Sequence, residues 1–260
     1  MKILFIFILF VTYTAHAQQK ITWPRHKKAV IILTYDDGLN SQLNTAIPQL
    51  DSAKLPATFF LCGDLNYVTI PKWQAVNKKG FELANHTVYH PCISTDDNPV
   101  ASGNYTPYTI VREIATMNNL LYAIDGKTAR NYAYPCTETI VGGKSYVDAL
   151  KKSGFIKYAR VGGDADAIIT DFKNLDPLLV PAYGLNGNNT GAELIAYVKR
   201  VQESGGMGIF MFHGIGGDYI STPAASHRQL LAYLKKHKKE IWVATFQQAM
   251  DYVSQQEHLK

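Results

Sequence analysis

The sequence of 260 residues has few cysteines and no long apolar run after its first residues. Its three cysteines, Cys62, Cys92 and Cys136, allow one disulfide and leave one thiol over. A small scaffold held together by disulfides is therefore excluded, and the spacing matches no zinc motif made of cysteine pairs. No later stretch reaches the roughly 20 apolar residues that a membrane-spanning helix needs. We therefore expect no membrane span.

The sequence also has only a small excess of positive over negative charge. Lys and Arg number 26 against 21 Asp and Glu, which gives a formal net charge of +5. A short basic cluster at Lys235, Lys236, Lys238 and Lys239 is typical of a solvated helix end, so nucleic acid is not expected as a partner. The sequence also has no repeat, linker or low-complexity tract. We expect residues 18–260 to form one domain and the protein to be a monomer.

The start of the chain has the pattern of an export signal. Lys2 supplies a positive charge, residues 3–13 are mostly apolar, and Ala-His-Ala at residues 15–17 matches the signal peptidase cleavage pattern. An apolar run of about 11 residues is too short for a membrane anchor. Residues 1–17 are therefore expected to be a signal peptide, and the protein to be exported to the periplasm or the extracellular space.

Short apolar runs alternate with segments of helical periodicity in the rest of the chain. We expect strands over residues 29–34, 57–61, 81–85, 131–134, 155–160, 208–212 and 241–244. We expect helices over residues 43–53, 72–79 and 106–126, and after the capping box at residues 190–193. This alternation predicts parallel pairing in an α/β barrel or a wound sheet. Residues 91–104 and 165–189 are expected to be loops around a site.

Two groups of polar residues follow buried strands. Asp36 and Asp37 lie in Thr-Tyr-Asp-Asp-Gly at residues 34–38, and although Asp-Gly alone is a common turn, adjacent carboxylates need a compensating cation. His86 and His90 are four residues apart and would lie on one face of a helical turn, so both rings could reach one ion. One carboxylate with two histidines is a three-ligand zinc arrangement that leaves a position for water.

A third strand, expected over residues 208–212, is followed directly by His213. The carboxyl ends of parallel strands form the edge at which active sites of α/β folds lie. Asp36, Asp37, His86 and His213 all follow strands in this way, so we expect them to meet at one site.

With these motifs the sequence resembles the polysaccharide deacetylases of the NodB-homology type, carbohydrate esterase family 4, over residues 29–252. The family's T-F-D-D-G motif is matched at residues 34–38 and its H-S/T-x-x-H motif at residues 86–90. Its L-x-H motif is approximated by Met-Phe-His at residues 211–213. The resemblance implies an α/β fold, a distorted (β/α)7 barrel.

The resemblance also implies a role for each matched residue. Asp36 would be the general base that takes a proton from the attacking water, and His213 the general acid that protonates the leaving group. Asp37, His86 and His90 would hold Zn²⁺ or another divalent transition metal. The implied reaction is the removal of acetyl groups from a carbohydrate, which would contain N-acetylglucosamine or be O-acetylated xylan.

The third family motif, R-x-P-Y-G, is altered here to Ala-Tyr-Pro-Cys-Thr at residues 133–137. Cys136 takes the place of the Tyr whose backbone N–H contributes to the oxyanion hole, and it can still offer its own N–H. We expect Tyr134 and Pro135 beside it to contact the substrate. The Arg that orients the catalytic Asp in the family is replaced by Ala.

Two arginines could replace the missing one. Arg130 precedes its strand and is expected at the amino end, away from the chemistry. Arg160 ends the strand expected over residues 155–160, so we expect it to reach Asp36, the alternative being a surface Arg at a loop start. The Asp-Trp of the fourth family motif is not recognisable near residues 160–164.

The cysteines and tyrosines leave further alternatives. Cys92 and Cys136 should lie near the site, where export permits a disulfide between them, whereas Cys62 ends an apolar strand and is expected to be a buried thiol. Six tyrosines could stack on sugar rings or pack in the core: Tyr35, Tyr89, Tyr105, Tyr134, Tyr183 and Tyr219.

Two other functions also remain open at this point. The first is a non-catalytic carbohydrate-binding homologue, against which the intact motif residues argue. The second is a metal-dependent hydrolase of a small non-sugar amide, which a closed pocket would favour over an open groove.

Overall fold

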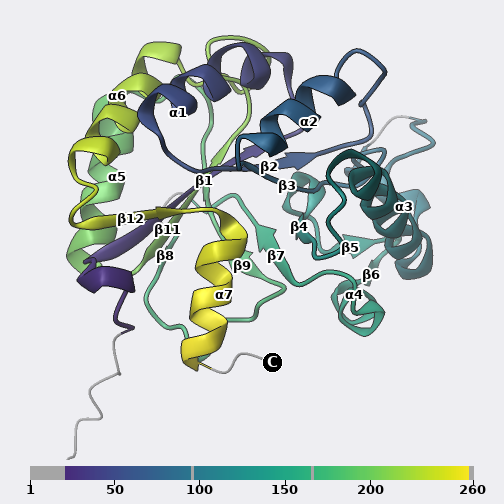
Figure 1. Cartoon of the computed structure of the whole chain (residues 1–260). Coiled ribbons are helices and arrows are strands. Elements are labelled where there is room, and N and C mark those ends of the chain that lie inside the picture. Colours follow the sequence, from purple (N-terminus) through teal and green to yellow (C-terminus); the bar gives the residue numbers. More distant parts are fainter. Residues whose placement is uncertain (1–20, 95–96, 165–166, 258–260) are drawn as a thin grey trace, which may run out of the picture.

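The computed structural model describes residues 21–94, 97–164 and 167–257 (Figure 1). The expected signal peptide at residues 1–17 lies outside these ranges. The helices are α1 (Ile47–Ala53), α2 (Ile70–Lys78), α3 (Pro107–Asp125), α4 (Val147–Ser153), α5 (Gly191–Ser204), α6 (Ala224–Lys236) and α7 (Phe246–Glu257). None of the helices in the described ranges combines the length and the apolar character needed to cross a bilayer.

The strands form one large sheet and a small hairpin. The sheet contains β1 (Ala29–Asp36), β2 (Thr58–Leu61), β3 (Glu82–Asn85), β4 (Asn131–Ala133), β7 (Tyr158–Val161), β8 (Ile168–Ile169), β9 (Val180–Pro181), β10 (Tyr183–Gly184), β11 (Met207–Phe212) and β12 (Ile241–Ala244). The hairpin pairs β5 (Ile140–Val141) with β6 (Lys144–Ser145).

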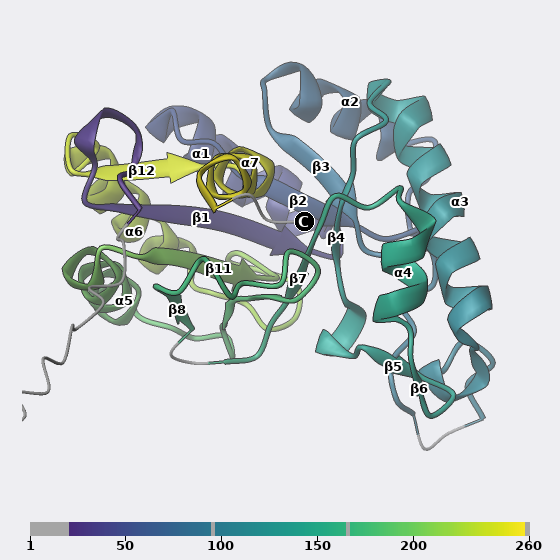
Figure 2. The ribbon, with the colours of Figure 1, turned by 90° about the horizontal axis from the view of Figure 1, so that it is seen from below.

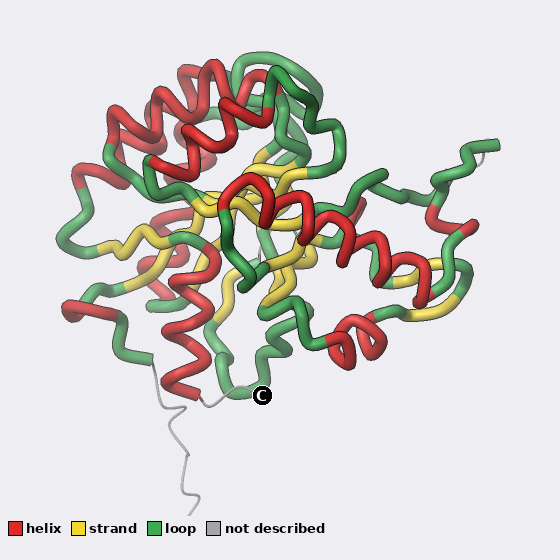
Figure 3. Tube along the Cα trace, turned by 45° about the vertical axis from the view of Figure 1, so that its right-hand side comes forward, coloured by secondary structure: helices red, strands yellow, loops and turns green. Residues whose placement is uncertain are grey.

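The large sheet is nearly closed into a barrel. Its order is β10-β11-β1-β2-β3-β4-β7-β9, and the strands along this path run parallel. Only Ala182 separates β9 from β10, so the two ends of the path meet in one extended segment and the barrel has seven strand positions. Helices α1, α2, α3, α5 and α6 lie outside the strands (Figure 3). The predicted (β/α)7 barrel is confirmed.

Side-chain alternation along β1 determines which of its residues face the inside of the barrel. Successive residues of a strand point to opposite faces. The outward set packs against the helices, namely Ala29, Ile31, Leu33 and Tyr35, whereas Val30 and Ile32 pack inside the barrel. Asp36 continues the inward row at the carboxyl end of the strand.

Helix α7 covers the opposite end of the barrel, beside β1 in Figure 2. Its Phe246 and Met250 belong to the inner core, and the Phe246 N–H donates to Thr58 Oγ1 at the start of β2. The amino ends of the strands are therefore closed by apolar packing, which leaves the carboxyl ends for a site.

Several local predictions are confirmed. Thr106 caps α3, and Gly126 ends it in the left-handed conformation at φ 71°. The capping box of Thr190 and Glu193 opens α5, with both of its hydrogen bonds present. The basic cluster begins in the last turn of α6, as expected for a solvated helix end.

Other local predictions are wrong or incomplete. Residues 165–189, expected to be a loop, contain β8, β9 and β10, whose two residues each are too few to show a period of two. The strand expected over residues 155–160 begins at Tyr158, after the Gly154 that ends α4. Helices α4 and α7 were not predicted, and of α6 only the basic end was.

Candidate active site

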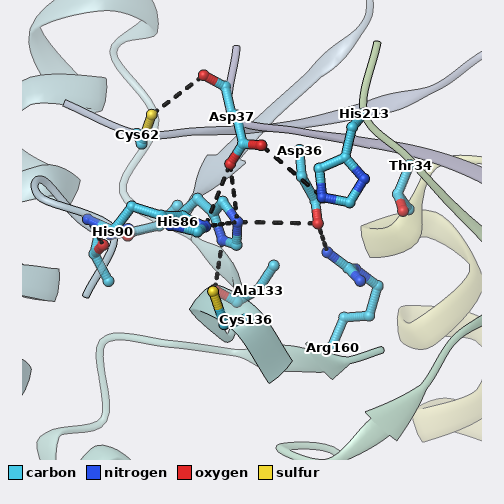
Figure 4. Close-up of polar contacts among 12 residues, drawn as sticks. Thr34, Asp36, Asp37, Cys62, His86, His90, Ala133, Cys136, Arg160 and His213 are labelled. Carbon is cyan, nitrogen blue, oxygen red and sulfur yellow. Dashed lines mark hydrogen bonds and ion pairs between the residues drawn. The ribbon is translucent and has the colours of Figure 1, made fainter. Parts of the chain in front are cut away.

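The residues predicted to meet do meet, at the carboxyl ends of the barrel strands (Figure 4). Asp36 is the last residue of β1, His86 follows β3, Arg160 lies in β7, and His213 follows β11. They surround or underlie a pocket of about 470 Å³. Its lining is Asp36, Asp37, His86, His90, Tyr134, Cys136, Thr137, Met211, His213, Tyr219 and Ile220.

Three ligand atoms converge at one side of this pocket. Asp37 Oδ1 lies 3.4 Å from His86 Nε2 and 3.4 Å from His90 Nε2, and the two Nε2 atoms are 3.1 Å apart. His86 Nδ1 lies 2.8 Å from the carbonyl oxygen of Ala133, to which it can donate, and this leaves the Nε2 lone pair facing the other two atoms. Ring nitrogens so close repel unless a proton or a cation lies between them.

These residues fit a divalent metal ion. Asp37 Oδ1 is buried and accepts no hydrogen bond within the part of the chain that the structure describes. One carboxylate oxygen and two imidazole nitrogens are donors that Zn²⁺ and other divalent transition metals accept. The sequence predicted Asp37, His86 and His90 as metal ligands, and the structure brings all three together.

The helical turn expected for His86 and His90 is absent. Thr87 and His90 have positive φ angles of 67° and 50°, which turn the chain back on itself after β3. Asn85 Oδ1 accepts from the Thr87 N–H and Thr87 Oγ1 accepts from the His90 N–H, at 2.8 and 2.9 Å. Glu113 Oε1 accepts the amides of residues 88 and 89. This tight loop, and not a helical turn, brings the rings of His86 and His90 together.

The ligand cluster also shifts the protonation of its members. Burial alone would raise the pKa of Asp37, but the adjacent His86, with smaller contributions from His90 and Tyr219, holds that pKa well below its usual range. Burial and the neighbouring His86 lower the pKa of His90 to about 4. The Tyr219 hydroxyl donates to Asp37 Oδ2 at 2.7 Å. The lowered pKa values of Asp37 and His90 favour the ionised carboxylate and the neutral imidazole, the states that bind a metal, whereas the pKa of His86, which burial alone would lower, is raised by Asp37 and Asp36.

Asp36 forms a buried ion pair with Arg160. The Arg160 Nη2 donates to Asp36 Oδ2 at 2.5 Å, and the two side chains are 1% and 3% exposed. The other carboxylate oxygen, Oδ1, is buried and has no partner among the described residues, and Asp36 is one of the residues that line the pocket. The expected contact of Arg160 with the Asp36 carboxylate is thus present, and the alternative of a surface Arg is wrong.

Arg130 lies where the sequence predicted, at the amino end of β4. It forms a second buried ion pair, with Nη2 at 2.5 Å from Asp125 Oδ1, and donates to the carbonyl oxygen of Leu83. It therefore stabilises the barrel on the side away from the pocket.

His213 faces the ligand cluster from β11. Its Nε2 lies 3.9 Å from Asp37 Oδ2, and its side chain is 14% exposed. Its Nδ1 is buried and has no hydrogen-bond partner among the described residues. No carboxylate in the described chain therefore holds this nitrogen.

The altered third motif forms a short turn beside the metal ligands. Residues Pro135–Thr137 make one 3-10 turn in which Cys136 has φ 50°. The Cys136 N–H has no acceptor among the described residues. Tyr134 and Cys136 line the pocket, whereas Pro135 is buried and is absent from the lining.

The cysteines adopt one of the states that the sequence left open. Cys92 is bonded to Cys136, and Cys62 is a buried thiol. Cys62 Sγ donates to the Asp37 carbonyl oxygen, and burial raises the pKa of this thiol to about 12. Cys62 is thus unreactive and helps to fix the turn that presents Asp37.

The loop after His213 was missed as part of the site. Tyr219 was predicted only as one of six candidate aromatics and Ile220 was not predicted, yet both line the pocket. Of those six tyrosines, Tyr89 and Tyr219 are exposed, at 61% and 54%. Ile220 has φ 46°, a costly angle for a β-branched residue. The Gly-Gly pair at residues 216–217 was the available signal for a tight turn here.

Comparison with known proteins agrees with this geometry. The profile of the polysaccharide deacetylase family matches residues 24–155. A Mycobacterium smegmatis protein described as a polysaccharide deacetylase has a TM-score of 0.68 at 18% identity, over 92% of this chain and 94% of that chain. No curated protein sequence matches.

Two further solved structures have a similar fold. The peptidoglycan deacetylase PdaC from Bacillus subtilis has a TM-score of 0.57 at 20% identity, over 88% of this chain and 93% of that chain. BA3943 from Bacillus anthracis is described as a pseudoenzyme of carbohydrate esterase family 4. It has a TM-score of 0.57 at 15% identity, over 88% of this chain and 67% of that chain.

Proposed function

Since this chain belongs to the polysaccharide deacetylase family, we propose that it is a metal-dependent hydrolase that removes acetyl groups from a carbohydrate. The observation that carries the proposal is the convergence of Asp37 Oδ1, His86 Nε2 and His90 Nε2 within 3.4 Å of one another. Next to them lies a buried carboxylate, Asp36, which lines the pocket and whose Oδ1 has no partner among the described residues.

Asp37, His86 and His90 would hold the metal, for which Zn²⁺ is our proposal. When bound, a divalent ion supplies Lewis acidity at the acetyl carbonyl and makes water more acidic. Asp36 would accept the proton of the attacking water through Oδ1, because Oδ2 is already occupied by Arg160. Arg160 is not among the residues that line the pocket and would act as a positioning residue for this base.

Two other groups would act on the tetrahedral centre and the leaving group. The Cys136 N–H has no acceptor in the described part of the chain and would donate to the oxyanion. His213 would deliver a proton from Nε2 to the sugar nitrogen or oxygen as the C–N or C–O bond breaks. Tyr134 would form part of the wall against which the acetyl group lies, and Pro135 would hold that wall from behind.

The proposed substrate is an N-acetylglucosamine-containing polysaccharide or oligosaccharide, with O-acetylated xylan as the second choice. The structural neighbour PdaC is described as a peptidoglycan deacetylase, which is consistent with the first choice. Tyr219, which lines the pocket, and Tyr89, which precedes His90 in the chain, are both exposed and would offer faces for stacking on sugar rings. Export and a single domain over residues 18–260 remain part of this proposal, as does a monomeric state.

A non-catalytic role is the alternative that one neighbour raises, since BA3943 is described as a pseudoenzyme. In this chain the proposed ligands, base and acid are all present at one pocket. A site that had lost catalysis would be free to lose some of these side chains. Their joint presence favours the enzyme.

The deciding experiment measures acetate release from chitooligosaccharides, peptidoglycan fragments and acetylated xylan. Wild-type protein should release acetate from at least one of them, chelation should abolish the activity, and added Zn²⁺ should restore it. Asp36→Asn is the matched control, because it keeps the three ligands but removes the base. Full activity after metal removal would rule out the mechanism, and no release by any metal-loaded preparation would favour the non-catalytic role.

A further inference from the structure

The disulfide between Cys92 and Cys136 joins two walls of the pocket. Cys92 comes two residues after the ligand His90, and Cys136 lies in the turn that would supply the oxyanion hole. The two residues are 44 positions apart in the chain, with Cα atoms separated by 5.8 Å. One covalent bond thus connects a metal ligand with an oxyanion donor.

The bond has a specific position relative to His90. Cys92 Sγ lies 3.5 Å from His90 Nδ1. A sulfur in a disulfide carries no hydrogen, so in this contact it can only accept from the Nδ1–H. That leaves the Nε2 lone pair of His90 facing Asp37 and His86, as metal binding requires.

The Nδ1 atoms of the two histidine ligands have different partners. His86 is fixed in the same tautomer by a backbone acceptor, the carbonyl oxygen of Ala133 at 2.8 Å. No backbone or carboxylate oxygen in the described chain holds His90 Nδ1. Histidine ligands normally donate their second N–H to such an acceptor. In this chain the disulfide sulfur takes that place.

At its other end the bond fixes an unfavourable backbone. Cys136 and Thr137 have φ angles of 50° and 62°, and neither residue is glycine. Consecutive left-handed residues persist only where their surroundings over-determine them. Cys136 is exposed to solvent, so packing of its side chain contributes little, and the covalent bond adds a constraint to the turn's two backbone hydrogen bonds, from the amides of Thr137 and Glu138.

A second connection between the same walls lies further from the metal ligands. The Ile93 N–H donates to Glu138 Oε1 at 2.9 Å. This hydrogen bond ties the two segments together but touches neither His90 nor Cys136. It therefore provides a matched control for a purely structural tie.

We propose that the Cys92–Cys136 disulfide is a positioning element of the active site, which fixes the His90 tautomer and the Cys136 backbone N–H. The role in turnover rests on the proposed function, whereas the role in metal binding does not. Reduction by a dithiol or a phosphine would convert the bond into two thiols while the reductant is oxidised. A thiol at Cys92 can donate to Nδ1 and so favour the tautomer that does not bind metal.

The first test compares Zn²⁺ affinity, by competition with a chromophoric chelator, in wild type and in Cys92→Ala/Cys136→Ala. Loss of an outer partner of a ligand typically lowers metal affinity by about 10- to 100-fold, and this is the expected result. Glu138→Ala should lower thermal stability but keep wild-type Zn²⁺ affinity. Equal affinity in wild type and the double variant, or equal losses in both variants, would overturn the proposal.

The second test is kinetic and uses Zn²⁺-saturated protein. Because the oxyanion donor acts in the transition state, the double variant should lose about tenfold or more in kcat with little change in KM. A change confined to KM would refute the Cys136 half of the proposal. If the wild type releases no acetate at all, the proposed function fails while the Zn²⁺ comparison still tests the His90 half.

Reduction of the wild type provides a check that does not depend on the variants folding. Alkylation and mass mapping should find one free thiol before treatment with a phosphine and three after it. Zn²⁺ affinity and kcat should fall with the appearance of the two new thiols, and the double variant should not respond. Three free thiols in untreated protein would overturn the premise.

Discussion

Removal of the Arg160 charge is the most informative perturbation of the proposed base. Arg160 and Asp36 form an ion pair at 2.5 Å, and both side chains are almost fully buried. Arg160→Met keeps much of the side-chain volume but leaves the Asp36 carboxylate unpaired. Breaking a buried pair in this way costs about 3–5 kcal/mol of folding free energy.

The loss of rate follows from the same contact. Two charges about 4 Å apart attract by about 4 kcal/mol at an effective dielectric constant near 20. If a third of that attraction, about 1.4 kcal/mol, positions or ionises the base in the transition state, its loss in Arg160→Met lowers kcat about tenfold. If the whole of it does, turnover falls by nearly a thousandfold. We therefore expect kcat to fall between tenfold and a thousandfold, with Zn²⁺ content unchanged.

Arg130 supplies a matched control for this experiment. It forms an ion pair with Asp125 at the same distance of 2.5 Å, with side chains 1% and 0% exposed, but at the other end of the barrel. Arg130→Met should lose comparable stability in a denaturant titration while the folded protein keeps its wild-type kcat. Normal turnover by Arg160→Met, or an equal loss of kcat in both variants, would show that the reasoning about Arg160 is wrong.

Two other predictions concern the acid, the base and stability. Asp36→Asn should remove nearly all turnover, and His213→Ala should lower kcat by about 10²-fold or more, both with Zn²⁺ retained. Loss of metal by either variant would mean that a ligand was mistaken for a catalyst. Burial lowers the pKa of His227 from its ordinary value of 6.5 to about 3, so its neutral form stabilises the fold above pH 6.5 and that stability is lost as the pH falls towards 3. Denaturant titrations at pH 7 and pH 5 should show wild type losing stability by up to about 1.4 kcal/mol per pH unit more than His227→Gln, and parallel losses would refute this assignment.

Much of the site could be predicted because its residues belong to regular strands. The inward row of β1 ends in Asp36, and β11 delivers His213 in the same way, so strand periodicity and parallel pairing were sufficient. The geometry of His86 and His90 could not be predicted by that route. A spacing of four suits a helical turn, but Asn85, Thr87 and Glu113 stabilise a tight loop by hydrogen bonds that no local pattern announces.

The remaining features depend on contacts between distant segments. Tyr219 donates to Asp37 across a separation of 182 residues, and Cys92 reaches Cys136 across 44. Neither contact follows from local propensity, because each requires two strands that are distant in the sequence to pair first, β1 with β11 and β3 with β4. Closure itself depends on β9 and β10, which have two residues each and resemble a loop in the sequence.

The location of the arginine shows how neighbouring strands can exchange a function. In the parallel ladder between β4 and β7, Ala133 is the register partner of Arg160, so the position where the family motif has Arg lies directly beside the Arg found here. Side chains of register partners point to the same face of a sheet. The small side chain at Ala133 leaves room, and the cation reaches Asp36 from the next strand.

This exchange predicts that the cation can be moved back. Ala133→Arg combined with Arg160→Ala should turn over faster than Arg160→Ala alone, because the guanidinium starts from the paired position on the same inner face. Ala133→Arg alone should be destabilised, since a second buried cation would then lie beside a single carboxylate. Initial rates and denaturant titrations of the three variants provide the measurement. No gain of rate in the combined variant, with its fold intact by circular dichroism, would show that the two register partners are not equivalent and that the position of Arg160 carries a further requirement.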